Sequence, residues 1–232
     1  MSSKTYPTLS LETELVAAGS RFVIGIDEVG RGAIAGPVSV GASLLDSQDA
    51  RWSQAWPPKL RDSKLLTESV REELYEPVTT WLVGACVGSV AADDIDRIGI
   101  VEALARAAGT ALARLLDDQS LRGEIARDGA IVLLDGSHNW LAARAQGLPV
   151  VTRVKADRDC VSVSAASVLA KVERDRFMIQ SHQLHPQFGW VGNKGYASEE
   201  HIAALREYGP SELHRHSWLT KILASDEQLP LA

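Results

Sequence analysis

The chain has 232 residues, of which 24 are Lys or Arg and 30 are Asp or Glu, so its formal net charge is −6. With 45% hydrophobic and 23% charged residues, it is typical of a soluble globular protein with one large domain, or one domain and a small appendage. The acidic balance excludes nucleic-acid binding by bulk positive charge, but it does not exclude a locally basic groove.

Membrane, secreted and disulfide-rich classes are excluded as well. No apolar run approaches the roughly 18 residues that span a bilayer, and the first residues lack the basic and apolar layout of a secretory signal. The two cysteines, Cys86 and Cys160, are too few for a disulfide framework and lack metal-ligand spacing. We therefore expect a cytoplasmic protein with reduced thiols and no membrane partner.

The first half of the chain predicts strands with few helices between them. A helix is predicted over residues 11–18, ending at Gly19. Apolar, β-branched runs predict strands at residues 22–26, 38–45 and 82–90. A short helix is expected over residues 67–75, with Thr67 as its N-terminal cap.

In the second half, helices alternate with strands. Apolar residues recur every three or four positions over residues 99–116, which predicts an amphipathic helix. Further strands are expected at residues 130–134 and 150–154, and a long helix begins near Ser164. This order indicates an α/β protein with a mixed sheet, whose last third is mostly helical.

Carboxylates follow the predicted strands closely. Asp27 and Glu28 come directly after the first predicted strand, and Asp135 comes directly after the fourth. Because ligands of α/β sheets bind beyond the carboxyl ends of parallel strands, Asp27 and Asp135 are expected side by side. Asp157 follows the fifth predicted strand, and its convergence with the others would gather three or four acids at one rim.

Such an acidic cluster needs protons or a cation, because two carboxylates about 4 Å apart repel each other by roughly 4 kcal/mol at an effective dielectric constant of about 20. Carboxylate oxygens suit Mg²⁺ or Mn²⁺, and no Cys/His set favours zinc. All-carboxylate sites of this kind are typical of two-metal phosphoryl transfer. Taken alone, however, any one Asp at the end of a strand is explained more simply as a residue that stabilises the following turn.

A glycine-rich segment follows the acidic pair. Gly30 and Gly32 permit close approach of the main chain to a ligand, and Arg31 adds a guanidinium that can bind phosphate. By itself this segment is a turn between two strands. Directly beside Asp27 and Glu28, it indicates backbone groups that could hold a ribose or a phosphate next to a metal.

Together these motifs resemble the ribonuclease HII family. Five blocks occur in the family's order and span roughly residues 22–223. They lie at residues 25–32 (GIDEVGRG), 62–64 (DSK), 134–136 (LDG), 155–157 (KAD) with 164–175, and 195–196 (GY) with 201–215. A chance match to one block is easy, whereas five blocks in order are specific.

The resemblance implies a ribonuclease H-like mixed sheet of about five strands flanked by helices. It implies a catalytic domain at residues 20–180, a helical C-terminal extension at 181–223 and a flexible tail at 224–232. The implied activity is hydrolysis of the RNA strand of RNA·DNA hybrids and nicking of duplex DNA 5′ of an embedded ribonucleotide, with a role in ribonucleotide excision repair. Mn²⁺ or Mg²⁺ would be the cofactor, the ends would be 3′-hydroxyl and 5′-phosphate, and the chain is expected to be a monomer.

The resemblance also implies residue roles. The catalytic and metal-binding residues would be the four acids Asp27, Glu28, Asp135 and Asp157. The 2′-hydroxyl, by which RNA differs from DNA, would be sensed by Gly30, Arg31, Gly32 and Tyr196, and Lys64 would contact phosphate. Asp175 is assigned to a structural ion pair and not to the metal site.

The remaining charged residues leave alternatives open. Lys155, Lys171 and Arg174 are candidates for a basic rim along the duplex, while a solvated helix face explains their charged neighbours. His214 and Arg215 are either structural or close to phosphate. Two other functions stay open: another metal-dependent nuclease or strand-transfer enzyme on the same fold, and a noncatalytic hybrid-binding module. Cleavage of pure DNA would favour the other nuclease or strand-transfer enzyme. An absence of cleavage with either metal would favour the binding module.

Overall fold

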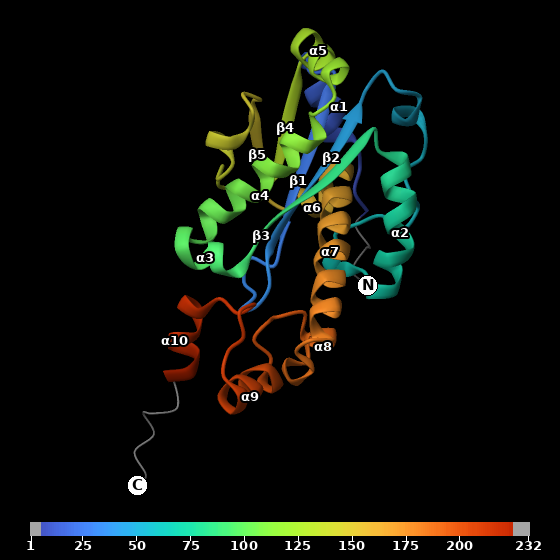
Figure 1. Cartoon of the computed structure of the whole chain (residues 1–232). Helices are drawn as coiled ribbons and strands as arrows, with labels where there is room; N and C mark the ends of the chain where they lie inside the picture. The colour runs from blue at the N-terminus through green and yellow to red at the C-terminus, as the bar shows by residue number, and fades with distance from the viewer. Residues whose placement is uncertain (1–5, 225–232) are drawn as a thin grey trace.

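The computed structural model describes residues 6–224, which form a five-stranded mixed sheet with helices on both faces (Figure 1). The strands are β1 (Phe22–Val29), β2 (Val38–Asp46), β3 (Gly84–Val90), β4 (Ala130–Asp135) and β5 (Val150–Arg153). Their order is β3-β2-β1-β4-β5. β1 pairs parallel with β4 and β4 with β5, whereas β1–β2 and β2–β3 are antiparallel. The predicted fold class is therefore confirmed.

The central strands are apolar because both of their faces are covered. β2 is buried along its whole length, and β1 is buried from Phe22 to Asp27. β1 also continues three residues beyond its predicted end, since Asp27 and Glu28 still pair with Gly41 and Val40 of β2. The two acids thus lie within the strand, where successive side chains point to opposite faces of the sheet.

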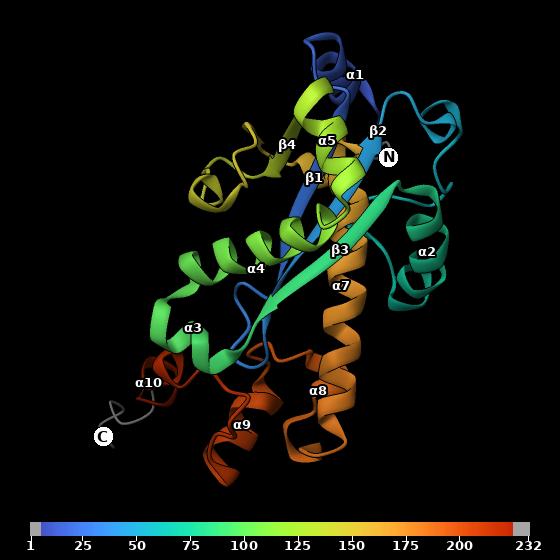
Figure 2. The same ribbon diagram turned by 45° about the horizontal axis from the view of Figure 1, so that its top comes forward.

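Two helices cover the sheet. α4 (Ile100–Leu115) packs on β2 and β3, and α7 (Val161–His182) packs on β1 and β2 from the other side, with α2 (Glu68–Trp81) against α7 (Figure 2). α4 begins one residue after the predicted start and ends one before the predicted end. Thr67 caps α2 as predicted, but α2 runs six residues further than expected. α7 begins three residues before Ser164.

Close approach of α7 to the sheet depends on two glycines. A Cβ atom on Gly25 of β1 would lie 2.4 Å from the carbonyl carbon of Ser162, and one on Gly41 of β2 would lie 2.3 Å from the carbonyl oxygen of Ala166. No real Cβ tolerates such distances, so any side chain here would push α7 away from the sheet. The helix can therefore bring its own residues next to the end of β1.

The other helices connect and extend this framework. They are α1 (Ser10–Ala17), α3 (Ala92–Ile98), α5 (Gln119–Asp128), α6 (Ala156–Asp159), α8 (Trp190–Asn193), α9 (Glu199–Tyr208) and α10 (His216–Ala224). α8, α9 and α10 lie beyond the C-terminal end of α7, at the bottom of Figure 1. The tail predicted at 224–232 falls outside the described residues except for Ala224, which ends α10. Within residues 6–224, no helix has the length and apolar character needed to cross a membrane.

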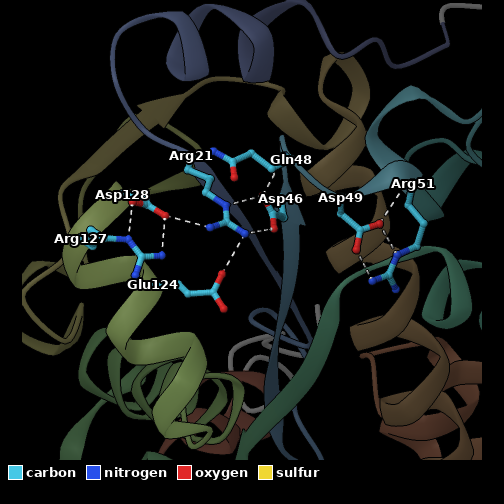
Figure 3. Close-up of polar contacts among 8 residues, drawn as sticks. All are labelled: Arg21, Asp46, Gln48, Asp49, Arg51, Glu124, Arg127 and Asp128. Carbon is cyan, nitrogen blue, oxygen red and sulfur yellow. Dashed lines mark hydrogen bonds and ion pairs between the residues drawn. The ribbon is translucent and has the colours of Figure 1, made fainter.

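A network of ion pairs ties the sheet together where β1 begins (Figure 3). Arg21 bonds both carboxylate oxygens of Asp46, at 2.9 and 2.7 Å, and pairs at 2.8 Å with both Asp128 and Glu124 of α5. Arg127 also binds Asp128. The network joins the start of β1 to the end of β2 and to α5. Asp27 lies toward the other end of β1, so this network does not take part in the acidic site.

Candidate active site

Two acids come together because β1 and β4 run parallel. Ile26 of β1 aligns with Leu134 of β4, so the next residues, Asp27 and Asp135, lie at the same level of the sheet, as the sequence predicted. Asp27 is only 3% exposed. Glu28, which points to the other side of β1, lies 3.3 Å from the guanidinium of Arg31.

Asp157 reaches the same region on a short helix. Lys155 adopts a left-handed conformation with φ of 63°, which turns the chain from β5 into α6. The amide of Ala156 then donates to Asp135 Oδ1 at 2.7 Å, and the amide of Asp157 does so at 3.4 Å. The start of α6 is therefore anchored on the acid that ends β4.

The DSK segment adds a cation and hydroxyls to the acids. Lys64 Nζ donates to Asp157 Oδ2 at 3.1 Å, and Asp62 holds this turn by accepting from the Lys64 amide at 2.9 Å. Ser63 lies 2.8 Å from the hydroxyl of Ser167 on α7, and Ser167 hydrogen-bonds Asp27. These supporting roles of Ser63, Asp62 and Ser167 do not follow from the sequence, because nothing local shows that α7 passes the end of β1.

The electrostatics of the acids reflect burial and mutual repulsion. Burial raises the pKa of Asp27 well above its usual range, and the charge of Glu28 adds to the effect. The pKa values of Glu28 and Asp135 are raised too, mainly by burial and also by nearby carboxylates. Hydrogen-bond donors near each acid lower its pKa, but they do not cancel this rise. Burial opposes the charge of Lys64, but Asp27 and Asp157 outweigh it, so the pKa of Lys64 is raised. The site thus carries an excess of negative charge that one ammonium only partly offsets.

The donor set fits a hard divalent cation in its chemistry. It consists of carboxylate oxygens, which Mg²⁺ and Mn²⁺ prefer, and the raised pKa values indicate charge that a cation would relieve. Within residues 6–224, however, no three Asp, Glu, His or Cys side chains surround a common point. Three acids are each turned to a different donor: Glu28 to Arg31, Asp135 to the α6 amides and Asp157 to Lys64.

The glycine-rich loop lies against the segment that carries Tyr196. The amides of Ile34 and Ala35 donate to the Gly195 carbonyl at 2.9 and 3.1 Å. Gly30 has φ of +77°, and a Cβ there would lie 2.1 Å from Arg174 Nε, so only glycine fits. Arg31 and Gly32 are exposed, and Tyr196 is 38% exposed. The structure thus brings together the two segments that the sequence reading assigned to 2′-hydroxyl sensing.

Two buried arginines hold this loop. Arg174 donates to the carbonyls of Pro37, Ala35 and Lys194 at 2.8 to 3.0 Å. Arg215 donates to the carbonyls of Gly30 at 2.7 Å, Arg31 at 3.0 Å and Gly36 at 3.1 Å. Of the alternatives for Arg215, the structural role therefore agrees with these contacts.

Part of the predicted basic rim is wrong. Arg174 is 1% exposed and faces the protein interior, because loop carbonyls take up its donors. Lys171 is turned to Asp175, whose carboxylate it bonds at 2.6 Å. Asp175 also pairs with Arg71 at 3.4 Å, which confirms its assignment to a structural ion pair. Lys155 is exposed and stays a candidate.

Comparison with known proteins agrees with the family resemblance of the sequence motifs. A family model described as Ribonuclease HII matches residues 24–221. Ribonuclease HII of Streptomyces coelicolor is 41% identical over 213 residues, covering 91% of this chain and 83% of that protein. Ribonuclease HII of Paracoccus denitrificans is 39% identical over 224 residues, covering 96% and 97%.

A solved structure agrees with these relatives. The crystal structure of ribonuclease H2 from Pyrococcus horikoshii has a TM-score of 0.67 with this chain at 26% identity, covering 85% of this chain and 93% of that one. The family match at residues 24–221 extends over both the sheet and the C-terminal helices. The chain therefore belongs to the ribonuclease HII family and is a ribonuclease H, a hydrolase of the endoribonuclease class.

Proposed function

We propose that this ribonuclease H hydrolyses the RNA strand of RNA·DNA hybrids and nicks duplex DNA on the 5′ side of an embedded ribonucleotide. The products would carry 3′-hydroxyl and 5′-phosphate ends, and the role would be ribonucleotide excision repair. Mg²⁺ or Mn²⁺ would be the cofactor. The observation that carries the proposal is that Asp27 and Asp135 lie at one level of the sheet, while Glu28 is joined through Arg31 to a loop hydrogen-bonded to the Tyr196 segment.

The acids supply the ligands in this proposal. Asp27 and Asp135 would be central, with Glu28 and Asp157 completing the sites. The chemistry that two such ions supply, when bound, is activation of the attacking water and stabilisation of the leaving 3′ oxygen. Lys64 keeps 68% of its side chain exposed beside Asp157, so its ammonium can reach a substrate phosphate.

Selection of a ribonucleotide would come from the loop and the tyrosine. Main-chain groups of Gly30, Arg31 and Gly32 would hydrogen-bond the 2′-hydroxyl, and the Tyr196 ring would pack on the sugar at the junction. The Arg31 guanidinium is 55% exposed on its side chain and can add a contact to phosphate. A deoxyribonucleotide would leave the main-chain groups unpaired and would therefore be rejected.

The test of the acids compares Asp27→Asn and Asp135→Asn with wild type. The substrates are an RNA·DNA hybrid, a DNA duplex with one ribonucleotide and an all-DNA duplex, each with Mg²⁺ and with Mn²⁺, and the ends are mapped. Each variant should lose about 100-fold or more in activity while its circular dichroism is unchanged. Asp93→Asn, an acid with a 72% exposed side chain, serves as the control and should keep full activity.

Full activity of either site variant would contradict the assignment of that acid. Efficient cleavage of the all-DNA duplex by wild type would favour a different nuclease on this fold. No cleavage of any substrate with either metal would favour a binding module.

The test of Tyr196 uses Tyr196→Ala, with Tyr208→Ala as control because Tyr208 is 59% exposed on α9. Cleavage at a single embedded ribonucleotide should fall by about tenfold or more, since an aromatic contact is lost at the junction, while hybrid binding should change little. Both are measured from kcat/KM and from equilibrium titration. Equal losses in cleavage and in binding would count against a sensing role.

The cellular setting stays a prediction from the sequence. We propose a cytoplasmic protein with reduced thiols, as expected from the sequence. We propose a monomer, which sedimentation of the purified chain would test, and name no protein partner.

A further inference from the structure

A pair of buried histidines is connected to the main chain of Tyr196. His201 on α9 and His214 just before α10 are both 0% exposed, and their Nε2 atoms are 3.0 Å apart. The indole nitrogen of Trp190, also fully buried, donates to His201 Nε2 at 3.1 Å. On its other side, His201 places Nδ1 2.8 Å from the carbonyl oxygen of Tyr196.

These contacts specify where the ring protons are. An indole N–H can only donate, so His201 Nε2 accepts and the His201 proton is on Nδ1, where it donates to the Tyr196 carbonyl. The amide of Ser211 donates to His214 Nδ1 at 2.9 Å, so the His214 proton is on Nε2. The N–H groups of His214 and Trp190 then share the single lone pair of His201 Nε2. Both rings are therefore neutral, with opposite tautomers.

The surroundings keep the pair neutral. Burial lowers the pKa of His201, and burial together with the neighbouring His201 lowers the pKa of His214 to about 4. The other titratable groups nearby are His185, bonded to Glu212 at 3.1 Å, and His216, which bonds the Ser211 carbonyl at 3.1 Å. Glu212 interacts with His214 through its charge, but its hydrogen bond is to His185 and not to either buried ring.

The network reaches the segment that carries the Tyr196 ring. Tyr196 is partly exposed, and the Arg174 guanidinium lies 5.5 Å from the ring centre. The preceding Gly195 carbonyl accepts the two amides of the glycine-rich loop. A displacement of the Tyr196 main chain would therefore change both the direction of the ring and its distance from the loop.

We propose that Trp190, His201 and His214 are positioning residues that orient Tyr196 for ribonucleotide selection. This inference rests on the proposed role of Tyr196 at the junction. The Tyr196 carbonyl accepts from His201 at 2.8 Å and from the Ser198 amide at 2.9 Å, so His201 fixes its direction together with the local turn. His214 and Trp190 in turn set the plane of the His201 ring. Small misplacements of a substrate-positioning group can cost large factors in rate, so a network without substrate contact can still affect selectivity.

The functional test measures kcat and KM on the single-ribonucleotide duplex and on the hybrid. His201→Ala removes the donor to Tyr196, whereas His201→Asn keeps a side-chain amide near the position of Nδ1. His201→Ala should lower kcat on the single-ribonucleotide duplex about tenfold, the size expected for one lost hydrogen bond, with KM and hybrid cleavage changed less. His201→Asn should recover most of that loss, and Tyr208→Ala should match wild type.

Equal losses on both substrates, or Ala and Asn variants that behave alike, would overturn the positioning role. His214→Gln gives a second measurement if His201→Ala fails to fold. It should also lower the activity on the single-ribonucleotide duplex relative to the activity on the hybrid. An unchanged ratio would also overturn the proposal.

A readout independent of activity is the ¹⁵N NMR signature of the histidine rings. His201 should show the Nδ1–H tautomer and His214 the Nε2–H tautomer, and both rings should be neutral at pH 7. Protonation of either ring at that pH, or the reverse tautomers, would overturn the network. If wild type fails to cleave at a single ribonucleotide, the proposed function fails while this NMR result still decides whether the network exists.

Discussion

Asp27 combines a proposed catalytic role with a cost in stability. It is 3% exposed, and burial followed by the charge of Glu28 raises its pKa well above the usual range. A carboxyl whose folded pKa exceeds its unfolded pKa ionises more easily in the unfolded chain. The stability cost of the buried Asp27 charge is absent at low pH. It grows as the pH rises above the pKa of Asp in the unfolded chain, about 4, and becomes constant only above the pKa of Asp27 in the folded protein.

The corresponding prediction concerns the metal-free protein. Asp27→Asn should raise the free energy of unfolding at pH 7 by about 1 to 2 kcal/mol, because the buried charge is removed, and the gain should shrink as pH falls toward 4. Thermal unfolding with chelator between pH 4 and pH 8 measures this, with Asp93→Asn as the exposed control. A variant less stable than wild type at pH 7 would show that the charge is compensated in the fold.

At the scale of elements, α7 depends on a side chain from the start of the chain. Its N-cap residue, Cys160, makes no side-chain cap. Instead Glu12 of α1, which is fully buried, accepts from the Ser162 amide at 2.9 Å and from the Ser162 hydroxyl at 2.8 Å. A carboxylate at a helix N-terminus satisfies free amides and interacts well with the helix dipole. Because Ser164 of α7 also bonds the Asp157 carbonyl, this cap supports the acidic site.

Removing the cap should have a graded effect. Glu12→Ala leaves the Ser162 donors buried without an acceptor and should destabilise the protein by about 2 to 4 kcal/mol. Glu12→Gln retains an oxygen acceptor and should cost about half as much or less. Urea unfolding measures both, with Glu14→Ala as the control on the exposed side of the same helix. Equal losses for Ala and Gln would mean that the charge, and not the acceptor, is what α7 needs.

At the scale of the whole molecule, the C-terminal extension holds the loop next to β1. Arg215 bonds the carbonyls of Arg31 and Gly30, which lie 184 and 185 residues away in the sequence. Arg174 of α7 bonds other carbonyls of the same loop. The loop geometry proposed for ribonucleotide sensing is therefore built by parts of the chain that meet only in the complete fold.

Loss of the Arg215 contacts should loosen this junction. Arg215→Met preserves much of the side-chain volume but leaves buried carbonyls without donors. The free energy of unfolding should therefore fall by about 2 to 4 kcal/mol. Arg97→Met is the control, because the Arg97 side chain is 68% exposed. Thermal unfolding and proteolysis of the loop measure the change. If Arg215→Met is as stable as the control, Arg174 alone is sufficient to hold the loop.

Several features of this protein were readable from the sequence because their causes are local. Apolar runs predicted all five strands, the period of apolar residues predicted α4, and Thr67 was recognised as a cap because a cap acts within one turn. Asp27 and Asp135 were expected at one level because parallel pairing is a general rule of such sheets. The end of α2 and the start of α7 differed from the prediction because tertiary packing extends helices beyond their local signals.

Other features were decided only by the tertiary structure. Charged residues are usually exposed, so the sequence predicts Lys171 and Arg174 on a surface rim. In the structure, Lys171 bonds Asp175 and Arg174 bonds loop carbonyls in the interior. Likewise, neither the Glu12 cap nor the His201–His214 pair follows from any spacing in the sequence. The sequence by itself determined the strands, the fold class and the alignment of Asp27 with Asp135. The direction and partner of each buried polar group depended on contacts between distant segments, which no local pattern encodes.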